Sequence, residues 1–196
     1  MKSTAWIAGV ALAAAASLVA QAQAPAAQPA AGKPAHSFTL TSPDITGGKI
    51  APAQVFNGFG CSGGNLSPAL TWSGVPAGTR SFALLMYDPD APTGSGWWHW
   101  LLYNLPASLT SLPAGAGDPH KNLLPAGALQ GRTDFGTPGY GGPCPPPGKP
   151  HHYHFWLYAL KVDKLDVPTD ATAAYISFSV HAQALGHAEL TGVYGR

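Results

Sequence analysis

Hydrophobic and aromatic residues gather in three long runs along this chain, and turn-forming residues separate them. The runs cover residues 80–87, 97–105 and 151–162, and shorter ones occupy 37–40 and 69–72. Leucine, tyrosine and tryptophan suit the pleated, half-buried surface of a β-sheet. The pattern therefore predicts a mainly β protein.

Alternation predicts which side chains share a face of each long strand, because successive residues of a strand point to opposite sides. Residues 97–105 are expected to place four side chains on one face: His99, Leu101, Tyr103 and Leu105. Residues 151–157 are expected to do the same with His151, Tyr153, Phe155 and Leu157.

Residues 171–190 form the one convincingly helical segment, and Thr169 or Asp170 is expected to cap its start. Within it, residues 175–180 (YISFSV) alternate as a strand would. We expect a helix here, with His187 exposed on its surface.

The composition favours one loop-rich domain over residues 37–196. The chain has 196 residues, which suits one well-cored domain and is short for two. Only 10% of the residues are charged, whereas 24 are glycine and 20 are proline. A net charge of +1 without a basic stripe argues against a nucleic-acid partner.

The N-terminal residues 1–24 have the pattern of an export signal. Lys2 precedes an apolar stretch, and Ala22-Gln-Ala24 is a small-x-small cleavage site, with cleavage favoured after Ala24. Residues 25–36, rich in proline and alanine, are predicted to be a linker. No later segment is long and apolar enough to span a bilayer. We therefore expect a periplasmic or secreted mature protein.

Two carboxylates and a histidine bracket the loop between the first two long runs. Asp88 and Asp90 stand where the first run ends, and His99 stands just inside the second. If these strands are neighbours, a carboxylate and an imidazole meet at one end of a sheet. Both acids also belong to proline-containing turns, where a purely structural role is common.

Several linked motifs resemble the phosphatidylethanolamine-binding protein family, and its bacterial Raf-kinase-inhibitor-like branch in particular. DPDAP precedes WWHW, and GPCPPPG precedes HHYHF, as in the two signature segments of the family. The segment beginning CSGGNLSP and the ending AELTGVYGR add to the likeness. The resemblance implies one compact domain of antiparallel sheets, with a few short peripheral helices near the C-terminus.

The resemblance also implies a small anion pocket and no defining catalytic reaction. The implied ligand-binding residues are Asp88, His99, His151 and Tyr153, with Asp90, Gly142 and Pro143 shaping the wall. Each imidazole can donate a hydrogen bond when neutral and gains charge when protonated. Asp88 suits the role of an acceptor that orients an imidazole, because an ionised carboxylate repels phosphate.

The remaining cysteines and histidines leave alternatives open. Cys61 and Cys144 are the only cysteines, and they form either a disulfide or two free buried thiols. His152 and His154 have a spacing compatible with metal ligands. No third ligand is identifiable, so we predict solvated or interface histidines and neither a metal nor a cofactor.

The expected function is therefore binding of a small phosphorylated or carboxylated ligand, such as a phospholipid head group, a nucleotide or a phosphorylated segment. One alternative is a regulator or inhibitor of a protein partner, a kinase or a protease, that uses the pocket as an anchor. A weaker alternative is a phosphoester hydrolase that uses Asp88, His99 and His151. The oligomeric state is open, a dimer included.

Overall fold

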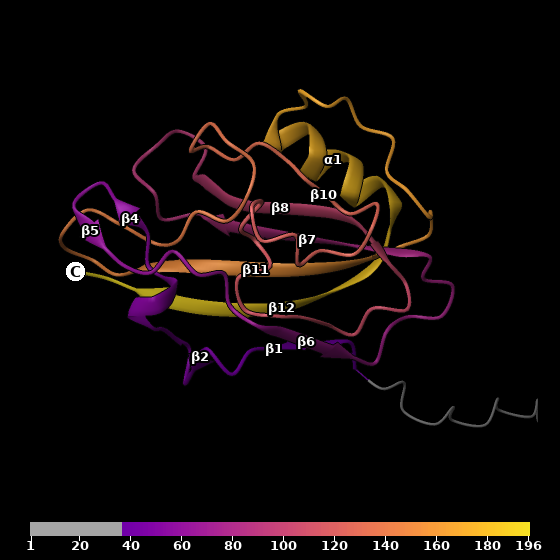
Figure 1. The fold of residues 1–196 in the computed structure, drawn as a ribbon, viewed down its shortest axis with the longest axis horizontal. Helices are drawn as coiled ribbons and strands as arrows, with labels where there is room; N and C mark the ends of the chain where they lie inside the picture. The colour runs from indigo at the N-terminus through magenta and orange to yellow at the C-terminus, as the bar shows by residue number, and fades with distance from the viewer. Residues whose placement is uncertain (1–36) are drawn as a thin grey trace, which may run out of the picture. The chain divides into compact units, whose positions relative to one another are not determined.

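The computed structural model describes residues 37–196, which form a mainly β domain with one α-helix near the C-terminus (Figure 1). The predicted fold class is confirmed. The elements are β1 (Thr39–Thr41), β2 (Ile45–Thr46), β3 (Lys49–Ile50), a 3-10 turn (Pro52–Gln54), β4 (Asn57–Gly58), β5 (Cys61–Ser62), β6 (Leu70–Ser73), β7 (Ser81–Asp88), β8 (Trp97–Pro106), β9 (Ser111–Leu112), β10 (Leu129–Gln130), β11 (His151–Leu160), α1 (Ala173–Gln183) and β12 (Ala184–Tyr194).

A seven-stranded sheet forms the centre of the fold, in the order β10-β8-β7-β11-β12-β3-β2. All of its neighbours are antiparallel except β12 and β3, which run parallel. A second sheet has the order β1-β6-β9, and β4 and β5 make a separate hairpin. The sheets are therefore largely antiparallel, as the family resemblance implies.

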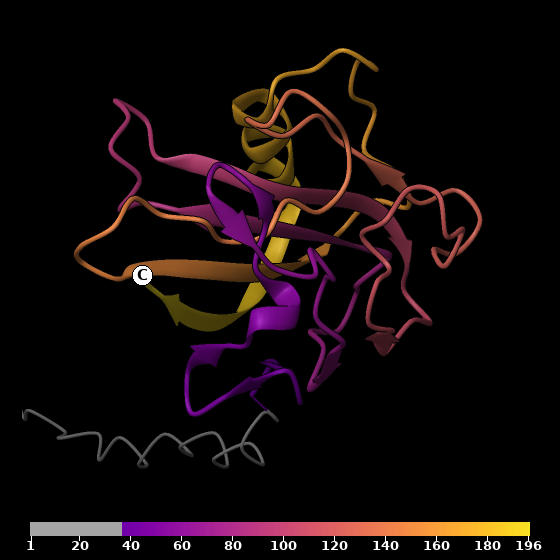
Figure 2. The same ribbon diagram turned by 60° about the vertical axis from the view of Figure 1, so that its left-hand side comes forward.

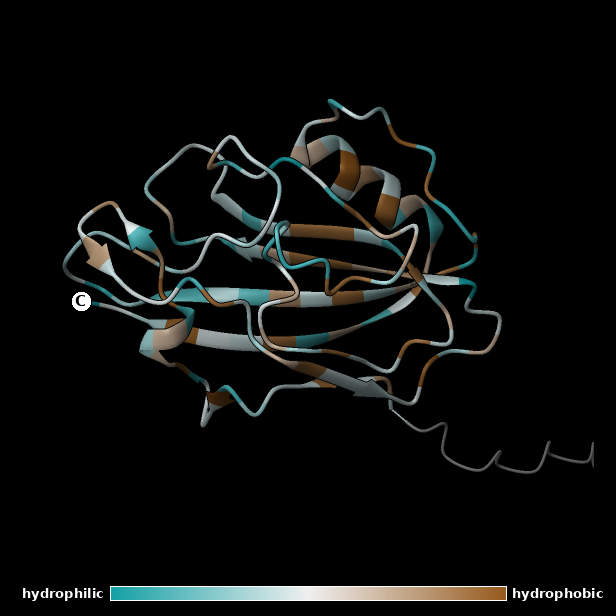
Figure 3. Ribbon diagram, in the orientation of Figure 1, coloured by the Kyte–Doolittle hydropathy of each residue, from teal (hydrophilic) through white to brown (hydrophobic). Residues whose placement is uncertain are grey.

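Both faces of the central sheet are covered. The helix α1 lies over one face (Figure 2), where Ile176 and Val180 belong to the same buried cluster as Ala83 and Leu85 of β7. The small sheet lies against the other face and buries a larger group of residues: Leu40, Leu70, Trp72, Phe82, Leu84, Met86, Trp100, Leu102, Phe155 and Leu157. Hydrophobic segments accordingly follow the middle of the central strands and one side of α1 (Figure 3).

Alternation is observed in β11 but is interrupted in β8. Tyr153, Phe155 and Leu157 share one face of β11, as predicted. In β8 the predicted single face is wrong, because the ladder with β7 shifts register twice. Met86 pairs with Trp100 and Tyr87 pairs with Trp98, so His99 is an extra, bulged residue. Such bulges re-aim side chains, and this one turns His99 away from the face of Leu101.

The helical segment is shorter than predicted. The helix begins after Thr172, whose hydroxyl accepts the backbone N–H of Tyr175, so Thr172 and not Thr169 or Asp170 is the cap. It ends at Gln183, and residues 184–194 form β12 instead. Ten residues of β12 pair with β11, and this ladder outweighs local helical preference. His187 is thus an exposed strand residue beside Tyr158, not a helical one.

The predicted signal (1–24) and linker (25–36) lie outside the described residues. Among residues 37–196, no helix has the length and apolar character needed to cross a membrane.

Candidate functional site

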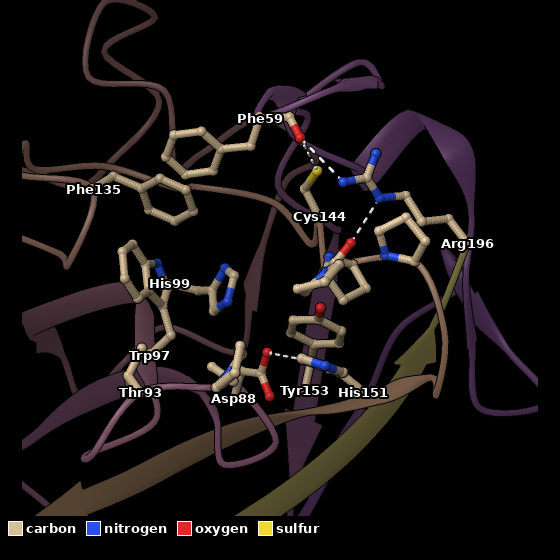
Figure 4. Close-up of a pocket in the computed structure, with 15 residues that line it drawn as sticks. Phe59, Asp88, Thr93, Trp97, His99, Phe135, Cys144, His151, Tyr153 and Arg196 are labelled. Atoms are coloured by element: carbon tan, nitrogen blue, oxygen red, sulfur yellow. Dashed lines mark hydrogen bonds and ion pairs between the residues drawn. The ribbon is translucent and has the colours of Figure 1, made fainter.

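The ends of three strands and the loops around them line a cavity of about 340 Å³ (Figure 4). Because β7 is antiparallel to both β8 and β11, its last residue lies beside the first residues of its two neighbours. The cavity is lined by Phe59, Asp88, Ala91, Pro92, Thr93, Trp97, His99, Phe135, Cys144, Pro145, Pro146, Pro147, His151, Tyr153 and Arg196. Four residues implied by the resemblance (Asp88, His99, His151 and Tyr153) thus meet in one place.

Asp88 and His151 form a buried pair at the floor of this cavity. The two residues are 3% and 8% exposed, and Nδ1 of His151 lies 2.8 Å from Oδ2 of Asp88. Oδ1 of Asp88 accepts the backbone N–H of Asp90 at 2.8 Å. With both carboxylate oxygens engaged, Asp88 holds the Nδ1 proton of His151 and leaves Nε2 available to a ligand.

His99 presents a hydrogen-bond acceptor, not a donor, to the cavity. Its Nδ1 lies 2.6 Å from the carbonyl oxygen of Gly141, which can only accept a hydrogen bond, so Nδ1 carries the proton. Burial lowers the pKa of His99 to about 4. The ring is therefore neutral near pH 7, and its Nε2 is an acceptor. The expectation that His99 donates to an anion is corrected, because its one proton is already used.

Tyr153 supplies the hydrogen-bond donor of the floor. Its ring is 1% exposed and packs at a right angle to His99, with 5.1 Å between the ring centres. Burial raises the pKa of Tyr153 far above its ordinary value, and the nearby Asp88 carboxylate adds to this. The hydroxyl therefore stays protonated, and it points into the cavity (Figure 4).

The three residues predicted to shape the wall do not line the cavity. Oδ2 of Asp90 accepts the backbone N–H of His152 at 2.9 Å and lies 2.7 Å from its Nδ1, and these hydrogen bonds lower the pKa of Asp90. Gly142 donates its N–H to Oδ1 of Asn65, and the carbonyl of Pro143 accepts from Phe56. These residues support the loops behind the wall, and the Gly142 N–H is not available to an oxyanion.

The upper wall is apolar, and sequence reasoning missed most of it. Phe59 and Phe135 stack with 5.8 Å between ring centres, and Trp97 meets Phe135 edge-on at 5.5 Å. The prolines 145–147 line the facing side. The proline-rich motif signals this second side, but Phe135 comes from an irregular segment without a periodic pattern.

Cys61 and Cys144 form a disulfide that bridges 83 residues of sequence. Cys61 belongs to β5, and Cys144 lines the cavity. The bond thus fastens the β4–β5 hairpin, which carries Phe59, to the proline-rich loop.

The other strand histidines pair with separate carboxylates. His152 pairs with Asp90 at 2.7 Å, and His154 pairs with Glu189 at 2.5 Å. Within residues 37–196, no group of three His, Cys, Asp or Glu side chains is arranged to hold a metal ion.

Comparison with known proteins agrees with the motifs. A sequence profile described as phosphatidylethanolamine-binding protein matches residues 41–195. The UPF0098 protein YbcL of Escherichia coli is 54% identical over 82% of this chain and 88% of its own length. Its crystal structure superposes with a TM-score of 0.78 at 53% identity, covering 81% of this chain and 98% of that one, and is described as a member of the mammalian PEBP family.

Two further relatives extend this range. E. coli YbhB is 48% identical over 79% of this chain and 98% of its own length. LppC, a candidate lipoprotein of Mycobacterium tuberculosis, is 36% identical over 87% of this chain and 75% of its own length. The chain belongs to the phosphatidylethanolamine-binding protein family.

Proposed function

We propose that this protein binds a small ligand through a phosphate-like or carboxylate group that rests on the cavity floor. One observation carries the proposal. His151, whose Nδ1 lies 2.8 Å from Oδ2 of Asp88, presents its free Nε2 to the same cavity as the free hydroxyl of Tyr153. A hydroxyl and an imidazolium can both donate hydrogen bonds to an oxyanion.

Binding of an anion at this floor is coupled to the uptake of a proton by His151. A neutral His151 donates from Nδ1 to Asp88 and presents only an acceptor to the cavity. An anion makes protonation of Nε2 favourable, because the imidazolium then lies between two negative charges. The negative charge of Asp88 therefore assists the complex through His151.

His99 adds an acceptor on the same floor. Its neutral Nε2 suits a hydroxyl of the ligand, including the P–OH of a singly protonated phosphate. The apolar rings of Phe59, Phe135 and Trp97 suit the organic part of such a ligand, since concave binding sites are mostly apolar with a few convergent polar groups. The arrangement therefore favours a phosphorylated or carboxylated organic molecule.

Affinity for sulfate is expected to rise as the pH falls from about 8 to about 6, by up to about tenfold per pH unit. Sulfate keeps its charge across this range, so the change reports a proton taken up by the protein. His99 contributes nothing there, because its pKa of about 4 lies below the range. Isothermal titration calorimetry at several pH values measures the slope.

Two substitutions distinguish the contributions of the two histidines to sulfate binding. In His151→Asn the slope is expected to vanish, whereas in His99→Gln the affinity falls and the slope persists. Equal affinity of the wild type for sulfate at both ends of the range would count against proton-coupled binding.

A protein partner is the second candidate, and one observation favours it. Phe59 is 66% exposed at the cavity mouth, where a partner segment has direct access to it. This function predicts tight binding of a protein together with weak binding of free anions. Calorimetry with sulfate and with a phosphorylated peptide distinguishes the two.

We also propose that the protein acts outside the cytoplasm. The disulfide between Cys61 and Cys144 supports this, because disulfides persist in oxidising compartments. The similarity to a candidate mycobacterial lipoprotein and the pattern of residues 1–24 agree with it. Mass spectrometry of the protein from its native cell fractions tests both the location and the cleavage after Ala24.

A further inference from the structure

Arg196 is the only lysine or arginine among the residues that line the cavity. Three backbone carbonyls hold its guanidinium in place. Nε donates to Pro145 at 2.7 Å, Nη1 to Gly60 at 3.0 Å and Nη2 to Phe59 at 3.1 Å. These partners belong to the proline-rich loop and to the β4–β5 hairpin, the two sides of the upper wall. The cation is thus positioned before any ligand arrives.

The positive charge of Arg196 is not neutralised by these contacts. Its partners are carbonyl oxygens, and no Asp or Glu side chain of residues 37–196 lies within 4.0 Å of it. A guanidinium has five N–H groups, so one on each terminal nitrogen remains after the three hydrogen bonds. Each of these remaining N–H groups can donate to an oxygen of a carboxylate or phosphate.

Arg196 and the floor lie at opposite ends of the cavity. In Figure 4 the guanidinium enters beside Phe59 and Cys144, whereas Asp88 and His151 lie on the far side, below Tyr153. Phe135, Trp97 and the prolines 145–147 supply apolar lining to the same cavity. The cavity therefore combines a polar floor, apolar walls and a cation at its mouth.

We propose that Arg196 is a specificity-determining residue that selects ligands with a second acidic group. This inference rests on the proposed function, since the first anion occupies the floor. The ligand class is a short organic molecule with a phosphate-like group at one end, an apolar spacer, and a carboxylate or phosphate at the other. Inorganic phosphate reaches only the floor, and a head group with an alkyl tail leaves the guanidinium without a counter-charge.

A matched series of compounds tests the inference by calorimetry. Alkylphosphonates are compared with phosphonoalkanoates of equal chain length, in which a terminal carboxylate replaces the terminal methyl group. At the best chain length the carboxylate is expected to improve wild-type affinity roughly fivefold, as for a partly exposed ion pair. The preference should shrink at high salt, because salt screens exposed charges.

Variants separate recognition from wall support. Arg196→Gln is expected to bind both compounds with equal affinity, and Arg196→Lys to keep part of the preference. If the role of Arg196 were purely structural, Arg196→Gln would have lower affinity for both compounds, and the ratio of the two affinities would stay at the wild-type value. Lys121→Gln, an exposed lysine paired with Asp118, is the charge-matched control and should keep the wild-type ratio.

The outcomes are distinct. If neither compound binds the wild type, the proposed function fails. If the alkylphosphonate binds and the carboxylate brings no gain, or if Arg196→Gln keeps the gain, the proposed function stands and the assignment of Arg196 is overturned.

Discussion

Asp88→Asn is expected to weaken sulfate binding at pH 6 at least tenfold, about 1.5–3 kcal/mol, and to make the affinity independent of pH. The asparagine keeps the shape of the side chain but has only one acceptor oxygen. If that oxygen keeps the N–H of Asp90, the amide NH2 faces Nδ1 of His151. The imidazole then carries its proton on Nε2, so it donates to the anion without gaining charge.

Calorimetry with sulfate at pH 6 and pH 8 measures both effects. Asp163→Asn is the control, since this exposed carboxylate pairs with Arg80 and does not line the cavity. Unchanged affinity and slope in Asp88→Asn would contradict the role of Asp88 in orienting His151.

Gly142→Ala is expected to destabilise the fold by about 3 kcal/mol or more. A Cβ at this position would lie 2.1 Å from the carbonyl oxygen of Gln54 and 2.7 Å from the backbone nitrogen of Phe56. Both are main-chain atoms, so no side-chain rotation relieves the contact. Gly142 is thus required for the close approach of two backbones, which is a different reason from contact with an anion.

Urea unfolding of the oxidised protein measures this loss. Gly94→Ala is the matched control, because a Cβ there meets nothing within 4 Å and its φ is not in the left-handed region. A Gly142→Ala protein as stable as Gly94→Ala would show that the two backbones separate at little cost.

Much of the architecture was predictable from residue patterns. The three long apolar runs became β7, β8 and β11, because each is bounded by glycine and proline and carries residues that suit a buried sheet. The motifs around Asp88 and His151 also predicted that two distant segments meet. Neighbouring strands brought these residues to one end of the sheet.

Other features depend on contacts that no local pattern encodes. The bulge at His99 arises from register against β7, and β12 forms because β11 offers a long edge for pairing. The protonated nitrogen of His99 is set by Gly141, 42 residues away. Arg196 reaches the cavity only because β12 ends beside the proline-rich loop. Sequence reasoning assigns residue types to a site more readily than it assigns protons.

The disulfide between Cys61 and Cys144 has a practical consequence for anyone who prepares this protein. Material made in a reducing cytosol would keep the ladders of the central sheet, which need no sulfur chemistry. Its hairpin and proline-rich loop would lack their covalent link. The positions of Phe59 and Arg196 relative to each other would then be less strictly fixed. Ligand screens on such material would sample a looser mouth than the one described here, so the oxidation state of a preparation should be recorded before any negative binding result is accepted.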